Sequence, residues 1–292
     1  MPGQAAAFQD VAGSIAIGGD LRVRRLGFGA MRITGKGVWG DPPDRKAAVA
    51  LLRHVVARGV NFIDTADSYG PAVSEELIAE ALHPYPSDLV VTTKGGYRRP
   101  GPDRWEADGR PASLREACHA SLKRLKLQRV DLYQLHGVDS KVPLAESIGA
   151  LVDLQKEGKI RHIGVSNVSV AQLREARALA RIVSVQNRYN VEDRGFDDVL
   201  DTTSADGLAF LPWRPLGAGA LSGPGGTLHQ VATRLGATPL QVALAWLLGR
   251  SPAMLPIPGT SSIAHFEDNL AGAALRLSDG DMAALSAAKP PR

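Results

Sequence analysis

The sequence predicts an α/β fold, a (β/α)8 TIM barrel in which each short apolar strand is followed by an amphipathic helix. The apolar runs are nearly continuous, which is typical of parallel strands covered on both faces. Eight such strand-then-helix units follow one another over 292 residues, and a barrel of this kind typically has roughly 250 residues. No linker, repeat or low-complexity segment interrupts the pattern, so we expect a single domain over residues 1–292.

The elements are expected in a simple order. Residues 14–26, SIAIGGDLRVRRL, predict a hairpin with a Gly-Asp turn that caps the bottom of the barrel. The strands and the helices that follow them are predicted at 26–31 and 44–59, 60–64 and 74–82, 89–94 and 113–125, 130–136 and 143–158, 160–166 and 170–180, 183–187 and 195–205, 208–213 and 228–236 with 239–250, and 254–258 and 263–273. Ser74 is the predicted N-cap of its helix, residues 95–112 are predicted to be a long polar loop, and a last helix is expected near 278–288.

A doubly wound open sheet is the main alternative, because it also alternates strands and helices. That fold normally carries a glycine-rich G-x-G-x-x-G turn after an early strand. The segment GFGAMR (27–32) does not have this spacing. The barrel is therefore favoured.

The composition argues against several classes of partner. The formal net charge is +4 and aromatic residues make up 5% of the chain, so neither a basic stripe nor a set of stacking residues for nucleic acid is present. The single cysteine, Cys118, cannot form a disulfide within the chain, and we expect it in the core of a protein from a reducing compartment. The N-terminus lacks the basic start and apolar run of a signal peptide. No apolar run approaches the roughly 20 residues that span a bilayer. We therefore expect a cytoplasmic protein, a monomer or weak homo-oligomer, without a nucleic-acid or membrane partner.

Polar and ionisable residues recur where the predicted strands end. They are Asp64, Lys94, His136, the pair Ser166 and Asn167, the pair Gln186 and Asn187, and Trp213. Each has an ordinary structural explanation, such as capping a loop or meeting solvent. In a TIM barrel, however, these strand ends share one face, and active sites lie there. Taken together, the residues predict one pocket.

Asp64, Tyr69, Lys94 and His136 form a chemically coherent set. A phenol has an unperturbed pKa of about 10 and donates a proton poorly near neutrality. The ammonium of Lys94 is expected to stabilise the phenolate of Tyr69 and lower its pKa, while Asp64 holds Lys94 in place. The imidazole of His136 can donate a hydrogen bond to a carbonyl oxygen. The set suits the protonation of an oxygen on which negative charge develops, as hydride transfer to a carbonyl requires.

Eight segments carry a resemblance to a known family. In order they are GFGAMRI, FIDTADSYG, VVTTKGG, DLYQLH, KIRHIGVSN, SVQNRYN, PWRPLGAGAL and IPGTSSIAHFEDNL. They resemble the signature segments of the aldo-keto reductase superfamily from about residue 20 to 290, and in detail its bacterial branch with IPGTSS before the last helix. The resemblance implies a TIM barrel that uses NADPH, with NADH possible, to reduce aldehydes or ketones reversibly to alcohols.

The resemblance also implies roles for individual residues. Tyr69 is implied as the general acid, with Asp64, Lys94 and His136 completing a catalytic tetrad. The implied cofactor-binding residues are Ser166, Asn167 and Gln186 at the nicotinamide carboxamide, Trp213 stacked on the nicotinamide ring, Pro215, Leu216, Gly217 and Gly219 along the pyrophosphate, Gly259, Thr260, Ser261 and His265 near the 2′-phosphate, and Asp268 and Asn269 near the adenine. Ser262 adds a hydroxyl at the start of the last helix, and Ala30, Met31, Asp64 and Leu221 are implied as further cofactor-binding residues.

One departure concerns the 2′-phosphate. NADP-dependent members commonly place a lysine directly after IP and an arginine six positions later, but this chain has Gly259 and His265 there. The phosphate would then lie on hydroxyls, on N–H groups at a helix N-terminus and on imidazolium.

The sequence gives fewer indications of the residues that form the substrate pocket. Trp39, Tyr97 and Trp105 are candidate pocket walls, but each could equally be a surface aromatic at the barrel rim. The short C-terminal segment predicts an open pocket.

Two other functions stay open at this stage. One is a regulatory or redox-sensing subunit on the same barrel with slow turnover. The other is a metal-dependent hydrolase, but the first strand lacks the histidine pair that such a site would need, so no metal is expected.

Overall fold

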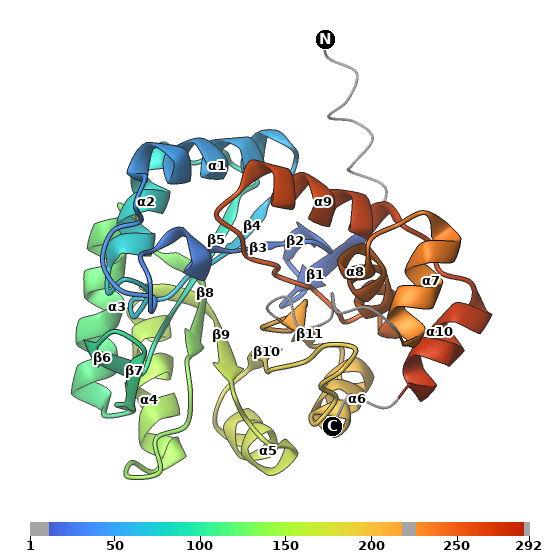
Figure 1. The fold of residues 1–292 in the computed structure, drawn as a ribbon. Helices are drawn as coiled ribbons and strands as arrows, with labels where there is room; N and C mark the ends of the chain where they lie inside the picture. The colour runs from blue at the N-terminus through green and yellow to red at the C-terminus, as the bar shows by residue number, and fades with distance from the viewer. Residues whose placement is uncertain (1–11, 218–225, 289–292) are drawn as a thin grey trace.

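The computed structural model describes residues 12–217 and 226–288, and it forms a barrel of parallel strands surrounded by helices (Figure 1). Seven strands pair in chain order, and every pairing is parallel. They are β3 (Phe28–Gly29), β4 (Phe62–Asp64), β5 (Val90–Gly95), β8 (Val130–Leu135), β9 (Ile160–Ser166), β10 (Ile182–Gln186) and β11 (Ala209–Phe210). The predicted TIM barrel is thereby confirmed.

An extended segment at residues 253–258 closes the barrel between β11 and β3. The Leu255 amide donates to the Phe210 carbonyl at 2.8 Å, and the Gly27 amide donates to the Pro256 carbonyl at 2.9 Å. This is the place of the predicted eighth strand. Pro256 and Pro258 have no N–H group to donate, so the segment holds the position of a strand without a full ladder.

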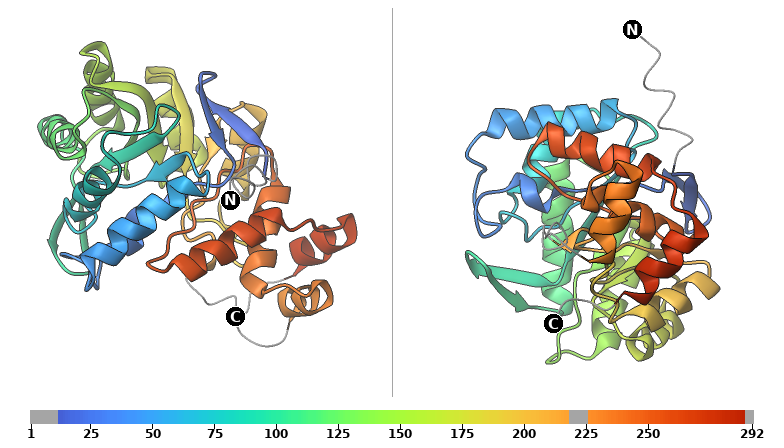
Figure 2. Two further views of the ribbon diagram at one scale, coloured as in Figure 1. Left: turned by 90° about the horizontal axis from the view of Figure 1, so that it is seen from above. Right: turned by 45° about the vertical axis from the view of Figure 1, so that its right-hand side comes forward.

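Ten helices are described, and they form the outer layer of the barrel (Figures 1 and 2). They are α1 (Arg45–Ala57), α2 (Val73–Leu82), α3 (Pro111–Leu125), α4 (Leu144–Lys156), α5 (Val170–Leu179), α6 (Asp197–Ala205), α7 (Thr227–Leu235), α8 (Pro239–Arg250), α9 (Ile263–Ala274) and α10 (Asp279–Ala287). Side-chain oxygens of Asp44, Ser169, Thr238, Ser262 and Ser278 accept backbone N–H groups at five of the helix starts. These caps explain why the boundaries lie close to the predicted ones.

The predicted N-terminal hairpin is present as β1 (Ser14–Ile17) and β2 (Leu21–Arg24). Ile17, Leu21 and Val23 pack in one apolar cluster with the first residues of barrel strands, among them Phe62 and Val90. Because those residues lie at the N-terminal strand ends, the hairpin closes the bottom of the barrel. The opposite end is left free for the site.

Three local predictions are wrong. Ser74 does not cap α2, because the helix starts at Val73, and the buried Ser74 hydroxyl instead donates to the Ala30 carbonyl at 3.2 Å. Residues 95–112 are not a plain loop, since β6 (Tyr97–Gly101) and β7 (Arg104–Ala107) form an antiparallel hairpin that projects from the barrel (Figure 2). The predicted first strand, 26–31, is shortened to β3, because residues Ala30–Ile33 turn into the 3₁₀ helix η1.

Among the described residues, none of the helices alone has the length and apolarity to cross a membrane. The bent pair α7 and α8 meets that test together, by length and composition.

Candidate active site

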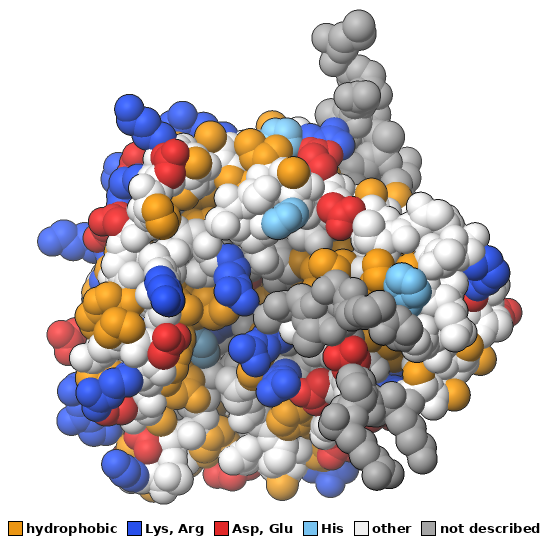
Figure 3. Space-filling model, viewed as in Figure 1, with side chains coloured by type: hydrophobic (Ala, Val, Ile, Leu, Met, Phe, Trp, Pro, Cys, Tyr) orange, Lys and Arg blue, Asp and Glu red, His pale blue; other side chains and the backbone are white. Residues whose placement is uncertain are grey.

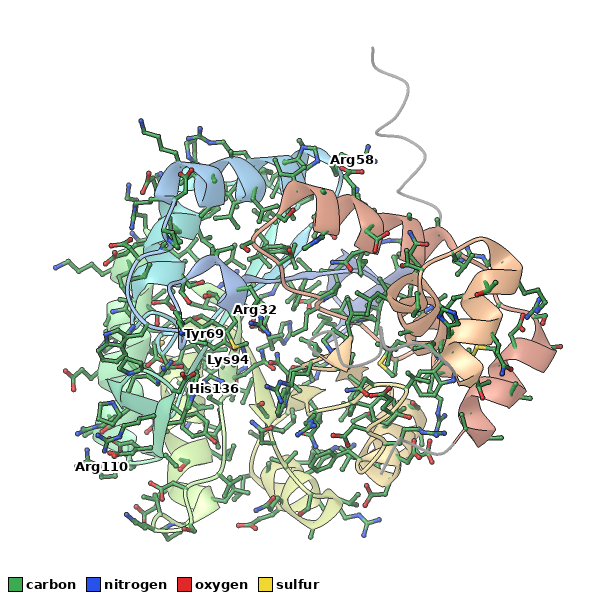
Figure 4. All side chains as sticks on the ribbon, in the orientation of Figure 1. Arg32, Arg58, Tyr69, Lys94, Arg110 and His136 are labelled. Atoms are coloured by element: carbon green, nitrogen blue, oxygen red, sulfur yellow. The ribbon has the colours of Figure 1, made fainter. Side chains whose placement is uncertain are left out.

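Lys94 is the centre of the polar cluster at the C-terminal ends of the strands. It lies at the end of β5 and is fully buried. Its ammonium donates to the Asp64 carboxylate at 2.7 Å, to the Thr65 carbonyl at 2.8 Å and to the Tyr69 hydroxyl at 3.3 Å. All three N–H groups of the ammonium are therefore used, and one of them binds the phenol. Figure 4 labels Tyr69, Lys94 and His136 close together.

The carboxylate of Asp64 is held from several strands. One oxygen accepts Lys94, and the other accepts the side-chain amides of Gln134 at 3.3 Å and Gln186 at 2.9 Å. These side chains come from β4, β5, β8 and β10, so the barrel itself positions the charge. A buried carboxylate with these partners fixes both the charge and the place of Lys94.

The ionisation of Tyr69 differs from the sequence-based expectation. Burial raises the pKa of Tyr69, and the neighbouring Lys94 opposes this without reversing it. The expected lowering of the pKa is therefore wrong, because the buried phenolate loses more hydration than one ammonium replaces. Burial alone would lower the pKa of Lys94, but Asp64 and Tyr69 together raise it. The site thus holds a protonated phenol next to a charged ammonium.

His136 directly follows β8, and it lines the same cavity as Tyr69. Its Nδ1 lies 3.3 Å from the Ser68 hydroxyl. The pKa of His136 is well below its ordinary value, because burial and the charges of Lys94 and Arg99 all disfavour imidazolium. In the tautomer with its proton on Nε2, the neutral imidazole accepts from Ser68 at Nδ1 and presents Nε2 as a hydrogen-bond donor.

A cavity of about 460 Å³ opens at this end of the barrel. Asp64, Tyr69 and His136 lie in its wall. Of the residues implied for the cofactor, Met31, Ser166, Asn167, Gln186, Trp213, Pro215, Leu216 and Gly259 also line it. Segments far apart in the sequence therefore converge on one space.

A hydrogen-bonded chain orients the part of the cavity wall that Ser166, Asn167 and Trp213 form. The Asn167 amide donates to the His136 carbonyl at 3.0 Å, and its oxygen accepts the Trp213 indole N–H at 2.8 Å. The Ser166 hydroxyl donates to the Gln186 carbonyl at 2.7 Å. Trp213 is thereby fixed at the rim of the cavity. Asn187, by contrast, is buried behind it and bonds the backbone of Val168.

The remaining implied cofactor residues lie outside this wall. Ala30 is fully buried. At the start of α9, the Thr260 hydroxyl accepts the Ser262 amide, and the Ser262 side chain caps the helix. Ser261 and His265 are exposed there. The Asp268 carboxylate is turned to α8, where it accepts from Gln241 at 2.7 Å, and Asn269 is buried. Gly217 is the last described residue before a gap, and Gly219 and Leu221 lie outside the described residues.

Of the three candidate substrate walls, Tyr97 and Trp105 line the cavity. The rings of Tyr69, Tyr97 and Trp105 stand edge to face around His136, with ring centres 5.8, 4.9 and 6.0 Å from the imidazole. Trp39 is placed behind this wall, with its ring 5.9 Å from the Arg99 guanidinium carbon, and Val38 lines the cavity in its place.

Comparison with known proteins identifies the family. Residues 25–290 match the model of the aldo/keto reductase family. The chain belongs to this family. It is an NAD(P)H-dependent oxidoreductase.

This aldo/keto reductase has relatives of similar length. It is 47% identical over 267 residues to pyridoxine 4-dehydrogenase of Escherichia coli, covering 89% of this chain and 93% of the relative. It is 46% identical over 267 residues to an uncharacterized oxidoreductase of Schizosaccharomyces pombe, covering 91% and 87%. Among solved structures, the glycerol dehydrogenase AKR11B4 of Gluconobacter oxydans is 27% identical with a TM-score of 0.84, covering 94% of each chain. An aldo/keto reductase of Klebsiella pneumoniae, solved with NADP and acetate, is 28% identical with a TM-score of 0.80, covering 96% of each chain.

The structure of this aldo/keto reductase explains the glycine at position 259. A Cβ atom there would lie 2.4 Å from the Gly29 carbonyl oxygen, so a lysine does not fit. The Cγ atom of Arg32 lies 3.5 Å from the same point, and Arg32 and Arg214 both line the cavity. Several Lys and Arg side chains lie to the left of and below the centre of this face (Figure 3), and Figure 4 labels Arg32 near the centre of the same view.

Sequence reasoning missed several residues of the site. Arg32, Arg214, Ser68, Gln134 and Arg99 were not predicted. Gln134 carried a usable signal, because it interrupts the apolar strand at 130–136. The others had none, since a basic or small polar residue in a loop is usually solvated. Across residues 12–217 and 226–288, no group of three or more His, Cys, Asp or Glu side chains is placed to hold a metal ion.

Proposed function

We propose that this chain reduces aldehydes and ketones to alcohols with NADPH, and that Tyr69 is the general acid. The observation that carries the proposal is the Tyr69 hydroxyl, which is buried, protonated and bonded to the Lys94 ammonium beside a neutral His136. Bound NADPH supplies a hydride to the carbonyl carbon. Every other step belongs to side chains of this chain.

The carbonyl oxygen of the substrate would accept hydrogen bonds from the Tyr69 hydroxyl and from His136 Nε2. As negative charge develops on that oxygen, the phenolic proton moves to it, and the C=O group becomes CH–OH. The phenolate left behind is stabilised by Lys94, which Asp64 keeps charged and in place. His136 stays neutral and works as a fixed donor, which is worth more in a buried site than in water.

The cofactor site is proposed from the cavity wall. Ser166, Asn167 and Gln186 would bind the carboxamide of the nicotinamide, and Trp213 would stack on its ring. The segment from Pro215 onward would follow the pyrophosphate, and the start of α9 with Gly259, Thr260, Ser261 and His265 would meet the 2′-phosphate. The cations Arg32 and Arg214 in the same cavity support an anionic ligand. The Klebsiella pneumoniae relatives solved with NADP and with NADPH support the choice of cofactor.

A flat aromatic aldehyde is the substrate class that we propose. Tyr97 and Trp105 present ring edges and faces beside His136, and such surfaces favour planar π-systems. The Escherichia coli relative at 47% identity is named for pyridoxine, an alcohol on a pyridine ring. Both observations favour an aromatic over an aliphatic carbonyl.

The test of this function is the oxidation of NADPH and NADH in the presence of aromatic and aliphatic aldehydes, for the wild type and His265→Ala. We expect aromatic aldehydes to consume NADPH faster than NADH. The ratio of the NADPH rate to the NADH rate should fall toward one in His265→Ala, because a hydrogen-bond donor to the 2′-phosphate is lost. Absence of carbonyl-dependent oxidation with both cofactors would contradict the proposed activity. An unchanged cofactor ratio would contradict the phosphate site at α9.

His136→Ala should lower kcat by about 10²-fold, because one preorganised donor to the developing oxyanion is removed. The loss should be greater for ketones than for activated aldehydes, which need less polarisation. Since the pKa of His136 is well below its ordinary value, no titration of this imidazole should shape the wild-type pH profile of kcat/KM between pH 6 and 8. His136→Gln keeps an N–H donor and should recover part of the rate. Equal losses for both substrate types would make His136 a structural residue.

A further inference from the structure

Arg99 joins three separate segments beneath the substrate side of the cavity. It lies on β6 and is 8% exposed. Its guanidinium donates to the carbonyl oxygens of Gly37 at 2.8 Å, Val38 at 3.0 Å, Ser68 at 2.9 Å and Arg104 at 2.9 Å. All four partners are backbone carbonyl oxygens, so Arg99 fixes the path of the backbone in these segments.

Each of these segments carries a wall of the cavity. Val38 itself lines it, Ser68 precedes Tyr69, and Arg104 precedes Trp105. The guanidinium carbon also lies 3.7 Å from the centre of the Trp105 ring, a stacked cation–π contact. Trp105 in turn stands edge to face on Tyr69, with ring centres 6.3 Å apart. One cation therefore connects the general acid to the outer wall.

The backbone at Val38 is strained, so contacts from the surrounding structure must keep it in place. Val38 has a φ of 54°, a conformation that β-branched residues rarely adopt. Arg99 binds the carbonyl groups of Val38 and of the residue before it. Such a conformation persists where the surrounding structure determines it.

We propose that Arg99 positions the substrate wall, the part of the cavity wall formed by Val38 and Trp105. By setting the distance of these two residues from Tyr69, Arg99 favours flat aromatic carbonyl substrates. The proposal rests on the proposed reductase function of the site. Arg99 does not touch the reacting atoms. A planar guanidinium is suited to this role because its five donors spread in a fixed plane that can also stack on an indole, which an ammonium cannot do.

Arg98 offers a matched control on the same strand. Its side chain is 61% exposed and pairs with Asp108. Arg98→Met and Arg99→Met remove the same charge and introduce the same side chain, one residue apart. A difference between them reports the contacts of Arg99 together with its charge near His136. Arg99→Lys keeps that charge and so separates the two effects.

The first experiment compares kcat and KM for an aromatic aldehyde and for propanal in these two variants. In Arg99→Met we expect kcat/KM for the aromatic aldehyde to fall about 10-fold or more, because small displacements of a binding wall are costly. The loss of kcat/KM for propanal should be clearly smaller, since propanal is small and makes fewer contacts with this wall. The NADPH dissociation constant should stay within about twofold of the wild-type value. Arg98→Met should match the wild type, and Arg99→Lys should resemble Arg99→Met. Equal losses on both substrates with weaker NADPH binding would overturn the proposal, as would wild-type kinetics in Arg99→Met.

The second experiment does not depend on turnover. Backbone bonds join the same segments, from Gly70 to Val38 at 3.2 Å and from Asp103 to Gly37 at 3.0 Å. The amides of Gly70 and Asp103 should exchange hydrogen faster in Arg99→Met than in Arg98→Met. Unchanged exchange would overturn the proposal. If the wild type reduces no carbonyl, the proposed function fails, while this measurement still decides the role of Arg99.

Discussion

Tyr69→Phe is expected to abolish measurable carbonyl reduction while NADPH binding stays nearly intact. The variant keeps the ring and removes only the hydroxyl that bonds Lys94 at 3.3 Å. General acid catalysis contributes about 10²–10⁴-fold, which sets the scale of the loss in kcat. The measurement is the single-turnover rate of NADPH oxidation together with the NADPH dissociation constant from tryptophan fluorescence.

Tyr85→Phe is the control for this variant. Tyr85 also loses a bonded hydroxyl, which donates to the Leu125 carbonyl at 2.8 Å. It lies outside the cavity wall, so its kcat should stay close to that of the wild type. A Tyr69→Phe enzyme within twofold of the wild-type rate would remove Tyr69 from the mechanism.

Lys94→Met should be both inactive and markedly less stable. Asp64 and Lys94 are buried with 2% and 0% of their side chains exposed, and their atoms are 2.7 Å apart. Removing one partner of a buried ion pair leaves an uncompensated charge and costs about 3–5 kcal/mol in the free energy of unfolding. Chemical denaturation of the variant measures this loss.

Two further variants separate the buried charge from other effects of the substitution. Lys94→Met with Asp64→Asn removes both charges and keeps an oxygen for Gln134 and Gln186, so it should be more stable than Lys94→Met alone. Lys156→Met breaks a surface pair with Asp153, in which Lys156 is 74% exposed. That change should cost less than about 1 kcal/mol. If Lys94→Met costs no more than Lys156→Met, the buried pair does not stabilise the fold.

Much of the barrel could be predicted from the sequence, because strands covered on both faces read as apolar runs and because helix caps are local. Asp44, Ser169, Thr238 and Ser278 lie directly before their helices and accept N–H groups within three residues. Ser74 has the same residue type at a similar place, yet it bonds Thr65 and Ala30. Local pattern cannot separate a cap from a tertiary hydrogen bond that satisfies the same hydroxyl.

The candidate tetrad was also visible in the sequence. Asp64, Lys94 and His136 interrupt or end apolar strands, where a charge is costly unless it has a function or a partner. Tyr69 joined this set on its chemistry, because a phenol near an ammonium can donate a proton. The segment resemblance added the roles of the individual residues and the cofactor residues that lie away from the strand ends. The convergence of these side chains on one cavity follows from the parallel order of the strands, which the sequence predicted.

The tertiary structure alone decided three things. The balance between burial and Lys94, which leaves Tyr69 protonated, depends on how much water the fold removes. The exclusion of any side chain larger than glycine at position 259 depends on the approach of Gly29 from the first strand. The cluster around Arg99 depends on two segments, 31 and 62 residues away in sequence, that meet the β6–β7 hairpin only in the folded barrel. Periodicity and motif spacing report which face of an element is buried, whereas these three features are set by distances between segments that no local pattern encodes.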